Sequence, residues 1–204
     1  MLSRRAILLD GGFVTKKLQA QLKRFPLAAD VNRECQRIAQ HPQLANRDLL
    51  RIYFYDASPA KDRLTNPIDG SALNLSATSE FRDHMSLLDK LELTPNFAVR
   101  RGEVVAHGWK LGSRAFKNMM KSPRAPAAND IVPDLEQKGV DLRIGLDIAR
   151  LALREMVDII VVVTGDSDLV PAFRFARREG VRVFLDHMGH GVRRELKAHA
   201  DILV

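Results

Sequence analysis

The sequence predicts an α/β fold with a central, mostly parallel sheet covered by helices on both faces. Strand-like runs of apolar, β-branched or aromatic residues alternate with segments of helical periodicity along nearly all of the 204 residues. Two apolar runs, at residues 6–9 and 161–163, end at turn-forming residues, as strands do at the carboxyl edge of a parallel sheet. Because no internal repeat or second-domain boundary is visible, we expect a single domain over residues 1–204.

The individual elements follow from periodicity and from Pro and Gly breaks. Strands are predicted at residues 5–9, 49–55, 159–163, 181–185 and 202–204, with a hairpin or two short strands at 97–101 and 104–111. Helices are predicted at residues 13–25, 31–40, 79–91, 139–156, 168–179 and 192–199. Loops are predicted at residues 56–74 and 112–133, the second long and only partly ordered.

Composition narrows the class of protein. Hydrophobic residues make up 46%, enough for a core, and no apolar run approaches the roughly 20 residues that span a bilayer. Cys35 is the only cysteine, so an intrachain disulfide is excluded and a reducing, cytoplasmic location is expected. The net charge of +7 favours a polyanionic partner, nucleic acid first. We expect no membrane partner, and the oligomeric state stays open, with a homodimer as one option.

Carboxylates follow two of the predicted strands. Asp166 and Asp168 come directly after one buried strand, and Asp10 ends another. A helix N-cap would explain Asp168 or Ser167 but not Asp166, and a turn before Gly11-Gly12 would explain Asp10. If the two strands are neighbours, however, the carboxylates converge and repel one another unless a cation or proton intervenes. An all-oxygen donor set favours Mg²⁺ or Mn²⁺ over zinc, so the sequence predicts a site for a hard dication.

Further charged residues could support such a site. Asp141 opens a predicted helix, where capping is the simpler explanation, and Asp147 six residues later is interpreted as a supporting carboxylate. Lys138 could contact a phosphate or be a solvated surface charge. A basic segment could grip a phosphate backbone without reading sequence, or be a solvated loop; it carries Arg114, Lys117, Lys121 and Arg124.

Two other enzyme classes fit less well. Phosphatases of the haloacid dehalogenase type have a second Asp two residues after the nucleophile, where this chain has Gly12. Their late motif commonly has a further Asp about four residues after the first, where this chain has Val170. Dinucleotide binding is disfavoured because no G-x-G-x-x-G motif follows a strand.

An ordered set of short motifs resembles the NYN-domain family of the PIN-like ribonuclease superfamily. The motifs lie at residues 7–12, 51–57, 138–141 with Asp147, 164–171, and 194–196 with residues 200–201. The resemblance implies a PIN-like three-layer fold and metal-dependent, endonucleolytic hydrolysis of RNA. It places the catalytic and metal-binding carboxylates at Asp10, Asp141, Asp166 and Asp168. Many members read Asp-Gly-x-Asn after the first strand, whereas Phe13 stands at the Asn position here.

These observations together predict a Mg²⁺- or Mn²⁺-dependent ribonuclease. Asp10, Asp141 and Asp166 would hold one or two cations, and Asp168 would orient a water or complete the ligand shell. Thr164 or Ser167 would donate hydrogen bonds, while Lys138 and the basic segment would hold flanking phosphates. The alternative is a weakly active or inactive module that binds RNA or protein on the same fold, and Phe13 favours it.

Overall fold

The structure is a computed structural model that describes residues 3–204, and it divides into two compact units. The first unit contains the described residues up to Asp56, together with Ser86–Gly102 and Gly139–Val204. The second contains Ala57–Met85 and Glu103–Lys138. The expectation of one domain over residues 1–204 stays a prediction.

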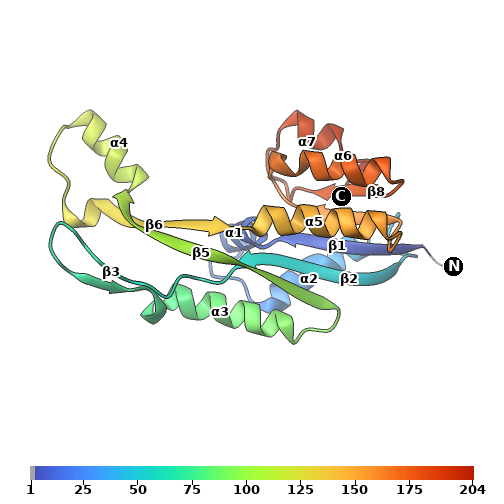
Figure 1. Cartoon of the computed structure of the whole chain (residues 1–204), viewed down its shortest axis with the longest axis horizontal. Coiled ribbons are helices and arrows are strands. Elements are labelled where there is room, and N and C mark those ends of the chain that lie inside the picture. The colour runs from blue at the N-terminus through green and yellow to red at the C-terminus, as the bar shows by residue number, and fades with distance from the viewer. Residues whose placement is uncertain (1–2) are drawn as a thin grey trace. The chain divides into compact units, whose positions relative to one another are not determined.

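A mostly parallel sheet forms the centre of the first unit (Figure 1). β1 (Arg4–Asp10) pairs in parallel with β2 (Asp48–Ala57) on one side and β7 (Ile159–Val163) on the other. β8 (Arg182–Asp186) and β9 (Ile202–Leu203) continue the sheet in parallel beyond β7. The whole sheet has the order β6-β5-β2-β1-β7-β8-β9. The predicted fold class is therefore confirmed.

Helices cover both faces of this sheet because its inner strands are apolar on both sides. One face packs against α1 (Gly11–Leu22), α2 (Ala28–Ala39) and the second half of α3 (Ser79–Glu92). The core there includes Ile7, Leu9 and Phe54 from the strands and Leu18, Ile38 and Leu88 from the helices. α5 (Val140–Leu153) lies against β1, with α6 (Val170–Arg178) packed beside it and α7 (Arg194–Ala198) following later in the chain.

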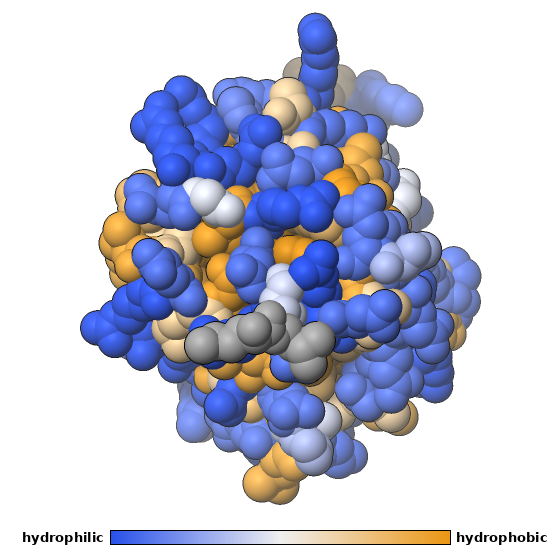
Figure 2. Space-filling view, turned by 90° about the vertical axis from the view of Figure 1, so that its right-hand side faces the viewer, coloured by the Kyte–Doolittle hydropathy of each residue, from blue (hydrophilic) through white to orange (hydrophobic). Residues whose placement is uncertain are grey.

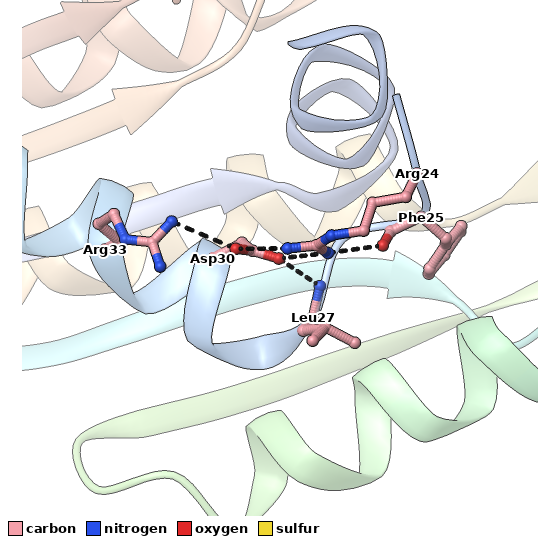
Figure 3. A network of polar contacts seen from close by, with 5 residues as sticks. All are labelled: Arg24, Phe25, Leu27, Asp30 and Arg33. Carbon is pink, nitrogen blue, oxygen red and sulfur yellow. Dashed lines mark hydrogen bonds and ion pairs between the residues drawn. The ribbon is translucent and has the colours of Figure 1, made fainter. Parts of the chain in front are cut away.

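A buried carboxylate orders the turn between α1 and α2 (Figure 3). Asp30 accepts a hydrogen bond of 2.8 Å from the backbone N–H of Leu27 and two from the guanidinium of Arg24, with Arg33 as a further ion-pair partner. Its side chain is only 4% exposed, so these donors replace its lost hydration. The hydrogen bond from Arg24 is the main reason that the pKa of Asp30 lies below its usual value.

The second unit contains two antiparallel strand pairs and a short helix. β3 (Arg63–Thr65) pairs with β4 (Ala72–Asn74), and a short 3-10 helix, η1 (Leu75–Ala77), follows. The part of β5 (Phe97–Leu111) beyond Gly102 pairs antiparallel with β6 (Ile131–Lys138). α4 (Ser113–Lys121) and η2 (Ala128–Asp130) lie between those two strands in the sequence.

Three predictions in this region are wrong. Residues 97–111 form one strand and not a hairpin, because β5 pairs with β6 and not with itself. The predicted loop at 56–74 contains β3 and β4, and the loop at 112–133 contains α4. The prolines that suggested a loop, at positions 123, 126 and 133, all come after the helix, where they do not interrupt it. None of the helices described, over residues 3–204, is long and apolar enough to cross a bilayer.

Candidate active site

The carboxyl ends of β1 and β7 lie side by side. The two strands are therefore neighbours, which is the condition under which the sequence analysis expected the carboxylates to converge. Leu9 is in register with Val163, so Asp10 and Thr164 are the next residues on two neighbouring parallel strands. Asp10 is also the N-cap of α1, where its Oδ1 accepts a hydrogen bond of 3.1 Å from the backbone N–H of Phe13. The sequence suggested only a turn role for Asp10, whereas the structure makes it an N-cap, and this cap occupies one of the two carboxylate oxygens.

A buried hydroxyl connects the two strand ends. Thr164 is fully buried, and its Oγ1 donates a hydrogen bond of 3.0 Å to Oδ2 of Asp10. The same Oγ1 accepts from the backbone N–H of Asp166 at 3.0 Å. Asp166 in turn caps η3 (Ser167–Leu169), accepting from the backbone N–H of Asp168 at 2.9 Å. Hydrogen bonds therefore join Asp10 through Thr164 to Asp166 and Asp168.

Asp141 reaches the same group from α5. It lies in the first turn of that helix, after Gly139, whose positive φ of 75° suits glycine. Burial is the main reason that the pKa of Asp10 is raised, and the negative charges of Asp141 and Asp166 raise it further. The pKa of Asp141 is raised by burial and by the charges of Asp166 and Asp168. Four aspartates from three segments of the chain thus lie close enough to repel one another.

This donor set fits a hard dication in its chemistry. The atoms that could bind a cation are carboxylate and hydroxyl oxygens, and a cation would offset both the burial and the mutual repulsion that raise the pKa values of Asp10 and Asp141. Among residues 3–204, no three His, Cys, Asp or Glu side chains are arranged as a ready metal site. The two oxygens of Asp10 each accept one hydrogen bond, from Phe13 and from Thr164, and each keeps a further lone pair that could bind a cation.

Asp147 has partners of its own. Its Oδ2 accepts a hydrogen bond of 3.0 Å from the hydroxyl of Tyr55 and one of 3.2 Å from Nε of Arg100. The guanidinium of Arg100 also stacks on the ring of Tyr53, with 5.4 Å between its Cζ and the ring centroid. This cluster ties α5, the helix that also carries Asp141, to β2 and β5.

Two glycines beside the site have no room for a side chain. A Cβ on Gly11 would lie 2.6 Å from the backbone oxygen of Tyr55, so α1 starts in close contact with β2. A Cβ on Gly165 would lie 2.7 Å from the ring of Phe13 and 3.1 Å from the ring of His190. The Phe13 and His190 rings meet edge to face, with 5.8 Å between their centroids.

The sequence did not reveal that His190 lies beside the Gly165–Asp168 turn. His190 lies in the loop after β8, which has no periodicity to place it. Helical spacing and the Gly-Asp motif identified the carboxylates, but neither pattern applies to a residue in a Gly-rich loop.

The predicted phosphate-binding residues all lie in the second unit. Arg114, Lys117 and Lys121 are exposed on α4, and Lys138 ends β6, with its Nζ 3.5 Å from a carboxylate oxygen of Glu136. Arg124 instead forms a bidentate pair with Asp130, which caps η2 and whose pKa is lowered to about 2 by that arginine. Arg124 thus anchors the loop after α4.

The fold and the site define an α/β domain with a group of aspartates at the carboxyl edge of a parallel sheet. The chain belongs to the NYN domain family, whose model matches residues 68–203. NYN domains are generally ribonuclease domains of the PIN-like type, and nucleases of this type usually need divalent metal ions.

Structural similarity supports the same three-layer fold. A crystal structure of a protein of unknown function from Vibrio parahaemolyticus superposes with a TM-score of 0.53 at 16% identity, covering 100% of this chain and 92% of the other. No curated protein matches the chain.

Proposed function

We propose that this protein is a Mg²⁺- or Mn²⁺-dependent ribonuclease that hydrolyses phosphodiester bonds of RNA within the chain. One observation supports the proposal: hydrogen bonds through Thr164 join Asp10 to the turn that carries Asp166 and Asp168, and the charge of Asp141 contributes to the raised pKa of Asp10. Such an arrangement is unfavourable for stability, so it points to a function that uses concentrated negative charge. The family to which the chain belongs supports the assignment to a nuclease.

Each residue would have a distinct part in the reaction. Asp10, Asp141 and Asp166 would hold one or two dications, and Asp168, the most exposed of the Gly165–Asp168 turn, would orient a water. When bound, the metal supplies an activated water and neutralises charge on the phosphate. Thr164 would keep Asp10 oriented through its hydrogen bond. Ser167 would be a donor to the phosphate or to a carboxylate.

Exposed cations of the second unit would contact phosphates of the RNA. Arg114, Lys117 and Lys121 lie on α4 with no carboxylate partner among the described residues, so all three are available to phosphates. Lys138 is separated by Gly139 alone from the helix that carries Asp141. Contacts of this kind position the RNA backbone without reading its sequence.

The central test compares two Asp→Asn variants on a labelled RNA with single-stranded and structured parts. Asp166→Asn keeps an N-cap for η3, because Asn is as good a cap as Asp, but it removes a site charge. Asp83→Asn removes an exposed charge from α3 and is the matched control. We expect Mn²⁺-dependent cleavage by the wild type and the control and at least a hundredfold lower rate for Asp166→Asn. Equal rates for both variants would refute the assignment.

A second candidate function is RNA or protein binding without turnover. The observation that favours it is the Phe13–His190 pair over Gly165, since an apolar ring occupies the position where many family members have Asn. Retained RNA binding with no Mn²⁺-dependent cleavage by the wild-type protein would support this candidate over the nuclease.

A further inference from the structure

A second charged feature lies at the opposite edge of the first unit's sheet. A cavity of about 390 Å³ opens between the C-terminal end of α6, the start of β8 and the segment after α7. Its charged lining consists of Arg174, Arg177, Arg178, Arg182, His199 and Asp201. Four guanidinium groups thus face one carboxylate in a single hollow. Figure 2 looks onto this amino-terminal edge of the strands, where hydrophilic side chains cover most of the surface.

Two of the arginines are held in place by the protein itself. Nε of Arg177 donates to Asp201 at 2.9 Å, and that carboxylate also accepts from the backbone N–H of Val183 at 2.8 Å. Arg182 donates to Gln43 at 3.0 Å, and its guanidinium stacks on the ring of Phe184 at 5.1 Å. These contacts order the walls of the cavity and leave it with a net positive charge.

The other two arginines have no acidic partner in the part of the chain that the structure describes. Arg174 and Arg178 are exposed, and they lie four residues apart on the same side of α6. Favourable interaction with the helix dipole explains Arg177 and Arg178 in the last turn. It does not explain Arg174 one turn earlier or Arg182 on the next strand, and both line the same hollow.

We infer that this cavity binds phosphate groups of an RNA chain at a distance from the cleavage site. Guanidinium groups bind phosphate through paired N–H donors, and a recess with four of them suits a phosphodiester backbone better than a neutral ligand. β7 alone spans about 13 Å between the two sheet edges, taking 3.3 Å a residue. The cavity would therefore hold nucleotides well removed from the one being cleaved. The inference rests on the proposed function, because it assigns RNA as the anion.

The test measures RNA binding by fluorescence anisotropy in EDTA, over a series of salt concentrations. The variant Arg174→Gln/Arg178→Gln removes the two unpaired arginines, and Lys23→Gln/Lys90→Gln removes two exposed charges away from the cavity. Each lost contact with single-stranded RNA lowers the slope of log affinity against log salt by about 0.7, so the arginine variant should lose about 1.4. The lysine control should keep the wild-type slope. Equal slopes for the two variants would overturn the inference.

A cleavage assay separates this inference from the proposed function. A dinucleotide has one phosphodiester and cannot reach both edges of the sheet, so the arginine variant should cleave it at the wild-type rate while cleaving a long RNA more slowly at low substrate concentration. Equal slowing on both substrates would overturn the inference and leave the nuclease assignment intact. If the wild-type protein neither binds nor cleaves RNA, both proposals fail.

Discussion

Asp10→Asn isolates the charge of one carboxylate with little change of shape. The Asn side chain keeps the cap on the Phe13 N–H, because Asn and Asp are equivalent N-caps within a few tenths of a kcal/mol. It also resembles a protonated Asp10 in size and neutrality. The negative charge that Asp141 and Asp166 repel disappears, and with it one ligand of the proposed metal site.

The expected magnitude follows from linkage. A ligand at 100 times its dissociation constant stabilises the folded state by about 2.7 kcal/mol. For a chain of this length, 1 kcal/mol shifts the Tm by about 2–4 °C, so saturating Mn²⁺ should raise the wild-type Tm by about 5–11 °C. Asp10→Asn should lose most of that shift and cleave RNA at least a hundredfold more slowly. Differential scanning fluorimetry over a Mn²⁺ titration, with Asp83→Asn as control, measures the effect. An equal shift in Asp10→Asn would refute a cation site that includes Asp10.

The same variant has a defined pH dependence without metal. The pKa of Asp10 is raised in the folded protein, so protonated Asp10 favours folding below its unfolded value of 3.8, and that contribution is lost as pH rises through the folded pKa. At neutral pH the ionised wild type therefore carries a penalty that Asp10→Asn lacks. We expect the variant to be more stable than the wild type at pH 7 in EDTA, and the difference to vanish below about pH 3.8. A wild type that is the more stable at pH 7 would contradict the raised pKa.

Three further predictions concern packing around the site. Gly11→Ala places a Cβ 2.6 Å from a backbone oxygen and should lower the free energy of unfolding by about 1–3 kcal/mol. Gly145 lies in a helix with its nearest neighbour 4.0 Å from an added Cβ, so Gly145→Ala should raise the free energy of unfolding by about 0.5–1 kcal/mol. Urea denaturation measures both values, and an unchanged free energy of unfolding for Gly11→Ala would contradict the close contact. Tyr55→Phe should cost about 1 kcal/mol in the same assay, because it removes the hydroxyl that donates to Asp147, and no loss would show that this bond contributes nothing. Phe13→Asn should cost about 1–3 kcal/mol through lost packing and raise the Mn²⁺-dependent cleavage rate several-fold, because an amide can bond to substrate; a slower variant would show that the ring itself assists the reaction.

The architecture of the first unit could be predicted because each of its elements carries a strong local signal. The β1 and β7 runs are apolar on both faces, which is typical of inner parallel strands, and their lengths match the observed strands closely. The helices that cover them have clear periodicity, and a proline or a glycine follows α1, α2, α3 and α6 within four residues. Errors there amount to a few residues at element ends.

The second unit was harder because its strands have no such pattern. β6 contains Pro133 and is mostly exposed or half-buried, so nothing in its sequence distinguishes it from a loop. Its identity as a strand depends on pairing with β5, a contact between distant parts of the sequence. That β5 is a single strand could not be predicted for the same reason, because Gly102 is typical of a turn and only the pairing with β6 shows that the strand continues through it.

In the candidate site, too, local sequence signals predicted some features, while others depend on contacts between distant residues. The end-of-strand rule correctly brought Asp10 beside the residues after β7, but it could not say which hydrogen bonds each oxygen makes. That Asp147 is held by Tyr55 and Arg100 depends on how α5 rotates against β2 and β5. No pattern in the sequence indicates how α5 is rotated about its axis.

The hydroxyl of Thr164 links the ordering of the candidate site to the binding of a cation there. One oxygen donates to a carboxylate on its neighbouring strand and also accepts from the amide that starts the next turn. If a cation shifts the Asp10 carboxylate, these shared hydrogen bonds transmit the movement to the turn that carries Asp166 and Asp168. The affinity of the site for a cation would then depend on the rigidity of that turn as well as on the attraction between opposite charges.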